Sequence, residues 1–234
     1  MATLKLLKNL SIATAGATIF LLESVGTAQA ATLWYNGDFD DVTGLANVIN
    51  TGVSDSYVYD DFTIADGEIW NIDTIWSNNL MTLTGVTQSA WFIRTGVSQG
   101  NGGTVVASGI SAATQTATGR KKNWLDEYRI EISGLNINLG AGTYWLSVAP
   151  IGFGSDSGWS FISTTSGANA VGNPAGNNQN SFWNSSFFGN NYQVHDKDFS
   201  MGIAGISKSV PEPNFALALL ALGILSAGSM LKRK

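Results

Sequence analysis

The chain has 234 residues, no cysteine, and a share of charged residues of only 12%. The absence of cysteine excludes disulfides, thiol nucleophiles and Cys-ligated zinc. Residues 31–208 carry fifteen acidic and seven basic side chains, and this negative balance argues against a nucleic-acid partner, which requires a basic surface.

The N-terminus has the three parts of a secretory signal peptide. Lys5 and Lys8 supply the positive charge, an apolar run extends from Ile12 to Leu22, and Ala28-Gln29-Ala30 is an A-x-A cleavage site. We therefore expect residues 1–30 to be a signal peptide. Signal peptidase would cut after Ala30 and leave Ala31 as the mature N-terminus.

Residues 31–208 predict a single all-β domain. Apolar and polar residues alternate along many short segments, and glycine and asparagine separate these segments as turns require. This pattern is typical of an antiparallel β-sandwich, and a jelly-roll-like form is the expected version. One short helix is predicted at Leu45–Ile49. The segments expected as strands are Val58–Ile64, Ile69–Trp76, Ser89–Thr95, Thr104–Ser108, Tyr128–Ile132, Leu135–Leu139, Tyr144–Val148, Trp159–Ser163 and Phe199–Ile203.

The tryptophans divide into core candidates and sugar-binding candidates. Trp124 follows a basic turn and Trp183 lies in an Asn- and Gly-rich stretch, Gly167–Tyr192, which is either a binding loop or a packed flap. Flat exposed rings stack on sugar faces, so Trp124 and Trp183 are the carbohydrate candidates. The tryptophans inside strand patterns, expected in the core, are Trp70, Trp76, Trp91, Trp145 and Trp159.

One acidic segment raises the question of a metal site. Asn36, Asp38, Asp40 and Asp41 concentrate the oxygen ligands that calcium prefers, but the spacing does not follow an EF-hand loop. Solvated turn acids are the favoured interpretation, a structural calcium is the alternative, and no cofactor is expected.

The remaining candidate chemistry favours a protein that is not an enzyme. The single histidine, His195, has no nucleophile elbow to partner it. Paired carboxylates for glycoside hydrolysis stay open, with Glu68, Glu127 and Glu131 as candidates. The alternation of Glu131 with Arg129 suggests instead a cross-strand ion pair. The segment Thr114-Gln115-Thr116-Ala117-Thr118 would place three threonines on one strand face, as ice-binding surfaces do. A single short row is weak evidence for ice binding.

The C-terminal segment, residues 209–234, reads as a membrane-associated tail. Pro211-Glu212-Pro213 excludes helix and strand, because each proline fixes φ and lacks a donor. The uncharged run Phe215–Leu231 would span roughly 25 Å as a helix, slightly less than a hydrocarbon core. The basic residues Lys232, Arg233 and Lys234 follow at once and are expected to stay cytoplasmic.

This tail resembles the PEP-CTERM sorting signal of Gram-negative bacteria. The resemblance covers about the last 25 residues and includes Pro211, Glu212 and Pro213, the apolar span and the basic terminus. It implies that exosortase, a membrane transpeptidase, removes the tail. More loosely, three segments resemble secreted sandwich proteins with this tail: Tyr35-Asn36-Gly37-Asp38-Phe39-Asp40, Asp60-Asp61-Phe62 and Asp198-Phe199-Ser200-Met201-Gly202-Ile203.

Together these features predict an exported, non-enzymatic protein of the cell surface or extracellular matrix. It would be held transiently in the inner membrane and would associate with extracellular polysaccharide. The alternatives are a secreted carbohydrate-active enzyme with paired carboxylates and an ice- or surface-binding protein. The sequence leaves the ligand and the oligomeric state open.

Overall fold

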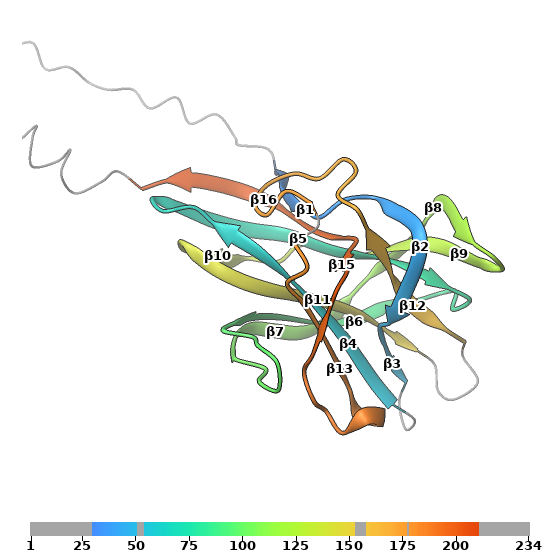
Figure 1. The fold of residues 1–234 in the computed structure, drawn as a ribbon. Helices are drawn as coiled ribbons and strands as arrows, with labels where there is room; N and C mark the ends of the chain where they lie inside the picture. The colour runs from blue at the N-terminus through green and yellow to red at the C-terminus, as the bar shows by residue number, and fades with distance from the viewer. Residues whose placement is uncertain (1–29, 51–53, 153–157, 177, 211–234) are drawn as a thin grey trace, which may run out of the picture.

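A computed structural model describes residues 30–50, 54–152, 158–176 and 178–210. This part of the chain is all-β and forms two stacked sheets of nine and seven strands (Figure 1). Neighbouring strands run antiparallel except β3 and β11, which pair in parallel through Ile49 and Ile151. The predicted β-sandwich class is therefore confirmed.

The first sheet has the order β1-β16-β5-β12-β15, and β10, β2, β9 and β8 pair alongside it. Its centre is the long strand β5, which pairs with β16 over one part of its length and with β9 and β12 over another. The bounds are β1 Ala31–Tyr35, β2 Phe39–Ala46, β5 Glu68–Met81, β8 Thr114–Lys122, β9 Leu125–Ile132, β10 Ile137–Leu139, β12 Ser160–Thr165, β15 Asp198–Phe199 and β16 Met201–Ser209.

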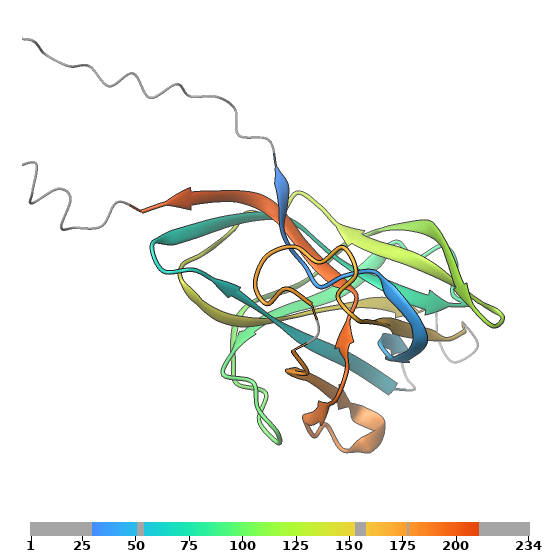
Figure 2. The same cartoon turned by 45° about the horizontal axis from the view of Figure 1, so that its top comes forward.

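The second sheet has the order β14-β13-β4-β3-β11-β6-β7. A short 3-10 helix, η1 (Ser186–Phe188), follows β13 and lies at the lower end of this sheet (Figure 2). The bounds of its strands are β3 Val48–Asn50, β4 Ser54–Ile64, β6 Gln88–Thr95, β7 Thr104–Ala112, β11 Gly142–Gly152, β13 Ser181–Ser185 and β14 Gln193–His195.

The main core lies between the two sheets. Trp34, Phe62 and Ile203 are fully buried there, and the rings of Phe62 and Trp70 stack with centroids 5.9 Å apart. Burial follows the sequence alternation: Ile130 and Ile132 are buried in β9, while Glu131 between them is partly exposed. The period-2 pattern thus identifies the sheet faces correctly.

The helix predicted at Leu45–Ile49 is wrong, because the chain crosses between the sheets at Asn47. Leu45 pairs with Ile162 in the first sheet, and Ile49 pairs with Asp55 in the second. The buried Asn47 side chain donates to the Val148 carbonyl at 2.8 Å and to Asn79 Oδ1 at 3.0 Å. These bonds stabilise the crossing, so four apolar residues at helix-like spacing belong to two strands instead.

The targeting segments lie outside the described residues, apart from their inner boundaries. Ala28 and the tail residues Pro211, Glu212, Pro213, Lys232, Arg233 and Lys234 are not described. Ala30 is exposed, and β1 begins at Ala31, which pairs with Gly205. Within the described ranges, no helix is long and apolar enough to cross a membrane.

Candidate functional site

A groove opens on the face of the first sheet that points away from the core. Val42, Thr43 and Gly44 of β2 line one side, and the β8–β9 hairpin lines the other with Lys122, Asn123 and Leu125. Leu80 of β5 and Phe161 of β12 complete the lining, and the volume is about 220 Å³. Gly44 packs so tightly that an added Cβ would lie 2.8 Å from the Phe161 Cβ. A larger residue at position 44 would therefore narrow the groove.

Two tryptophans expose their rings beside this groove. Trp124 is 67% exposed and lies in the hairpin turn between the lining residues Asn123 and Leu125. Asn123 takes the left-handed conformation (φ 54°) that asparagine tolerates in two-residue turns. Trp159 is 60% exposed and stacks on Phe161, with ring centroids 5.8 Å apart and planes at 8°. Two flat apolar surfaces thus flank a groove with polar sides.

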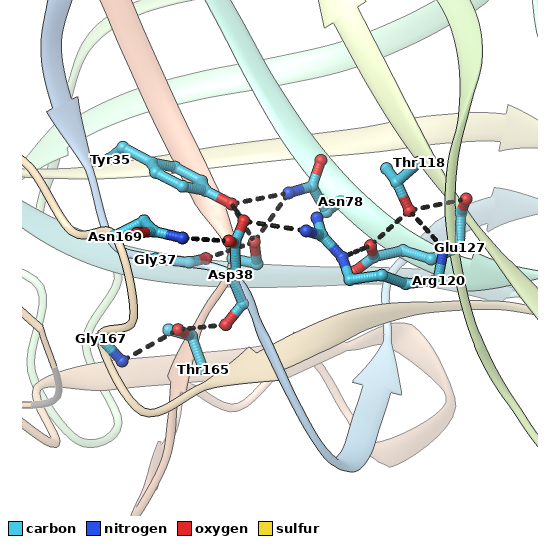
Figure 3. Close-up of polar contacts among 11 residues, drawn as sticks. Tyr35, Gly37, Asp38, Asn78, Thr118, Arg120, Glu127, Thr165, Gly167 and Asn169 are labelled. Atoms are coloured by element: carbon cyan, nitrogen blue, oxygen red, sulfur yellow. Dashed lines mark hydrogen bonds and ion pairs between the residues drawn. The ribbon is translucent and has the colours of Figure 1, made fainter.

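Next to the groove, Arg120 joins two carboxylates from distant parts of the chain (Figure 3). Its Nε donates to Glu127 Oε2 at 2.5 Å, and its Nη1 donates to Asp38 Oδ1 at 2.9 Å. Glu127 is completely buried, and Thr118 also donates to its Oε2, at 2.6 Å. A buried carboxylate requires such donors, because burial otherwise penalises the charged form.

Asp38 is the second hub of this network. Tyr35 donates to its Oδ1 at 2.7 Å, and Asn169 donates to its Oδ2 at 2.7 Å. Burial opposes ionisation of Asp38, but the hydrogen bonds from Tyr35 and Asn169 and the charge of Arg120 outweigh it and lower the pKa of Asp38. Burial also raises the pKa of Tyr35 to about 12. At neutral pH the network therefore holds a fixed carboxylate, a neutral phenol and a guanidinium.

The turn before Asp38 is set by Gly37. Its φ of +125° is one that residues with a side chain rarely adopt, and an added Cβ would lie 2.6 Å from Thr165 Oγ1. Thr165 in turn donates to the Asp38 carbonyl at 2.6 Å (Figure 3). Close packing of this turn on β12 therefore fixes where the Asp38 carboxylate lies.

The structure separates the tryptophan candidates. Trp124 is exposed as expected, but Trp183 packs partly against the core and donates from its Nε1 to the Ala46 carbonyl at 3.1 Å. The prediction that Trp159 belongs to the core is wrong, because it precedes β12 at the end of the sheet. The other four strand tryptophans are buried as predicted: Trp70, Trp76, Trp91 and Trp145.

The acidic segment proposed for calcium is divided among separate partners. Asn36 is buried and donates to Asp60 Oδ2 at 2.9 Å, whereas Asp38 binds Arg120. Asp40 accepts from Thr164 at 2.6 Å, and Asp41 pairs with Lys122 at 3.2 Å. Among the described residues no cluster of three or more His, Asp or Glu side chains is arranged to hold a metal ion.

The carboxylate candidates occupy three different environments. Glu68 accepts from Trp70 Nε1 at 3.1 Å at the start of β5, whereas Glu127 lies in the Arg120 network. Glu131 pairs with Arg129 at 2.5 Å, but the two residues lie in the same strand, so the predicted cross-strand pair is wrong. The residues opposite Glu131 are Trp76 of β5 and Thr114 of β8, and Arg129 lies over the Trp76 ring, 3.9 Å from its centroid.

His195 and the threonine row have structural surroundings. His195 lies in β14, its Nδ1 is 3.7 Å from Asp196 Oδ1, and burial lowers its pKa. Thr114 and Thr116 are exposed, but Thr118 turns inward to Glu127, where a β-bulge interrupts β8. The three threonines therefore do not form one exposed row.

Two features of the site have no signal in the sequence. Asp38 and Arg120 are 82 residues apart, and Trp159 sits at the end of an ordinary strand pattern. The basic residues just before Trp124 are the one indication of this site in the sequence, and they point to Trp124 alone.

The comparisons with known proteins add no family to this geometry. No family model, no curated protein and no solved structure matches the chain.

Proposed function

We propose that this protein is an exported, non-enzymatic component of the cell surface or extracellular matrix that binds polysaccharide through the groove beside Trp124 and Trp159. The signal peptide of residues 1–30 would direct export, and the PEP-CTERM-like tail with its membrane-spanning helix would direct sorting by exosortase. The start of β1 at Ala31, the expected mature N-terminus, supports the assignment of the domain boundary.

The pair of exposed tryptophans is the observation that carries the binding proposal. Large indole rings are costly to leave in water, and flat exposed rings are the surfaces on which sugar rings stack. Trp124 borders the groove on the hairpin side, and Trp159 stacks on the lining residue Phe161. A chain of sugar units could contact both rings while its hydroxyl groups meet Asn123, Thr43 and Lys122.

The charges near the groove favour a neutral polysaccharide. Lys122 pairs with Asp41, and Arg120 is shared between Asp38 and Glu127. Both cations are therefore already compensated, and no free basic side chain remains among the lining residues to meet a uronate or sulfate group. An acidic polymer would face the negative balance of the domain as a whole.

The same network argues for binding without catalysis. Glycosidases need one carboxyl group that can donate a proton and a second at a fixed distance across the bond. Asp38 and Glu127 are both bonded to Arg120, and the lowered pKa of Asp38 opposes a role for it as proton donor. We also propose that the strands of the sandwich have jelly-roll-like connectivity.

Co-sedimentation with the exopolysaccharide of the host tests the proposal. Each ring is expected to contribute about 0.5–1.5 kcal/mol, so the double variant Trp124→Ala/Trp159→Ala should bind roughly 5- to 150-fold more weakly. The control is Phe187→Ala, which removes a 76% exposed ring from η1, the 3-10 helix that follows β13, and should leave binding unchanged. Equal binding by the double variant and the wild type would overturn the groove assignment.

A further inference from the structure

Strand β7 leaves one edge of the second sheet open. It is last in the strand order, and within the described residues it pairs only with β6. A strand with one neighbour keeps a row of N–H and C=O groups pointing outward, which can pair with another strand. β7 runs for nine residues, from Thr104 to Ala112, which is long for a free edge.

This edge lacks the features that usually prevent pairing. Proteins protect free edges with charges, proline, short strands or bulges, yet residues 95–119 contain no charged residue and no proline. The one protective device is a bulge between the pairs Ile93–Ala107 and Arg94–Val105, which leaves the residues from 107 onward regular. The apolar side chains Val105, Val106 and Ile110 are exposed, Ile110 by 65%.

The other free edges in the described part of the chain are short or charged. β10 and β14 have three residues each and β15 has two. β2 carries Asp40 and Asp41, and β8 has its own bulge between Ala117 and Lys121 and ends in Arg120-Lys121-Lys122. β1 is covered beside Tyr35 by an antiparallel bridge to Val171. Of the edge strands in the described ranges, only β7 is long, uncharged and lined with exposed apolar side chains.

We propose that β7 pairs with β7 of a second copy of this chain, in antiparallel orientation, and joins two second sheets into one continuous sheet. The edge is complementary to itself: in an antiparallel pair centred on Ser108, Ile110 of each copy lies opposite Val106 of the other, and both side chains are exposed in the single chain. Each domain carries a net negative charge, and the uncharged edge lets two copies approach without like charges meeting. An antiparallel pair of identical strands also closes on a two-fold axis, so the assembly stops at a dimer.

Single-cysteine crosslinking of the full chain in its native host tests this pairing, because the chain has no cysteine of its own. Ser108 is exposed near the middle of β7, so two copies of Ser108→Cys should lie close together and be joined by a short bismaleimide. In the antiparallel arrangement two copies of Thr104→Cys would lie roughly 25 Å apart, at about 3.4 Å per residue. Thr104→Cys should therefore give little crosslinked dimer.

A second set of variants places a charge on the free edge of β7. In the Ser108→Cys background, Ile110→Lys should reduce the crosslinked fraction at least about tenfold, because it adds two like charges to the paired edge and places each lysine opposite the apolar Val106 of the other copy. Val194→Lys is the matched control: it adds the same charge at a 54% exposed apolar residue of β14 and should leave crosslinking unchanged. Resistance to protease in intact cells verifies that each variant is folded.

Each outcome decides the question. Crosslinking through Ser108→Cys that is lost with Ile110→Lys and kept with Val194→Lys supports the proposal. Strong crosslinking of Thr104→Cys to itself would contradict the antiparallel arrangement. Absence of crosslinking through Ser108→Cys, or equal sensitivity to both lysines, would overturn pairing at β7. None of these results depends on polysaccharide binding, so the groove proposal stands or fails separately.

Discussion

The side-chain amide of Asn36 donates to the buried carboxylate of Asp60 at 2.9 Å. The same Asp60 Oδ2 accepts from the Phe199 backbone N–H at 2.6 Å, and the Asn36 N–H donates to the Met201 carbonyl at 3.0 Å. Asp60 therefore joins β4, the end of β1 and the β15–β16 segment. Three segments that are far apart in the sequence therefore meet at one buried carboxyl group.

Asn36→Ala tests how strongly this junction stabilises the domain. The substitution removes one of the donors to a fully buried carboxylate, so we expect a loss of about 1–3 kcal/mol in the free energy of unfolding. Denaturation of the secreted protein in urea measures it. Asn138→Ala, at an exposed hydrogen bond to Asn71, is the control and should cost much less. Equal losses for the two variants would show that the buried hydrogen bond to Asp60 stabilises the domain no more than an exposed one does.

The second prediction concerns the Arg120 network. Arg120→Met leaves the buried Glu127 carboxylate without its cation, and we expect a loss of about 2–4 kcal/mol in unfolding free energy. Adding Glu127→Gln should restore part of that loss, because the remaining buried group is then neutral. Lys122→Met removes the pair with the exposed Asp41 carboxylate and should cost at most about 1 kcal/mol. A cost for Lys122→Met as large as that of Arg120→Met would contradict this interpretation.

A third prediction links pH to the loop that precedes β13. Burial raises the pKa of Asp198 to about 6, against the hydrogen bonds that its carboxylate accepts from the backbone N–H groups of Asn178 and Gln179. The charge of Asp61 adds to the rise. The folded protein thus binds a proton at Asp198 more tightly than the unfolded chain does, where the pKa is 3.8.

The sign of the stability change follows from this difference. Between pH 4 and pH 6 the folded state holds more protons at Asp198, so the contribution of this group to stability is largest near pH 4 and decreases as the pH rises to about 6. Asp60 and Asp61, whose pKa values are also raised by burial, act in the same direction. Asp38 acts in the opposite direction. Its pKa is lowered in the folded state, so its contribution to stability is lost only as the pH falls below the pKa of Asp38 in the unfolded chain. Asp198→Asn should flatten the pH 4–6 slope measured by thermal unfolding; an unchanged slope would rule Asp198 out.

Local sequence pattern predicted the sheets better than it predicted the site. Alternation such as that around Tyr128 and Ile132 marks the buried face because side chains of a strand alternate in direction. The same reasoning predicted a helix at Leu45–Ile49 and failed, because Asn47 donates to the carbonyl of Val148, a residue 101 positions away in the sequence. Trp159 and Trp76 lie in similar sequence patterns, but Trp159 precedes β12 at the end of the sheet and is exposed, whereas Trp76 lies within β5 and is buried.

The partners of charged residues could not be predicted for a similar reason. Arg120 lies within the bulge of β8, between the paired residues Ala117 and Lys121, and its side chain contacts Glu127 and Asp38. A bulge shifts the side-chain register and leaves no reliable mark in a single sequence. Asp60 likewise reads as one of two adjacent acids in a strand. Its burial becomes understandable only when Asn36 and Phe199 are seen to donate to it.

The last prediction concerns sorting. The apolar run Phe215–Leu231 is short for a bilayer, so we expect it to hold the protein only transiently. The basic residues Lys232, Arg233 and Lys234 would remain cytoplasmic, and Pro211-Glu212-Pro213 would stay extended on the outer side, within reach of exosortase. Replacement of Pro211, Glu212 and Pro213 by alanine should therefore leave an unprocessed protein in the inner membrane. Deletion of residues 215–234 should release the domain into the periplasm instead, unretained and unsorted. Fractionation of host cells with and without exosortase distinguishes the two roles. Surface delivery of the alanine variant with its tail removed as efficiently as in the wild type would show that the tail is an ordinary anchor.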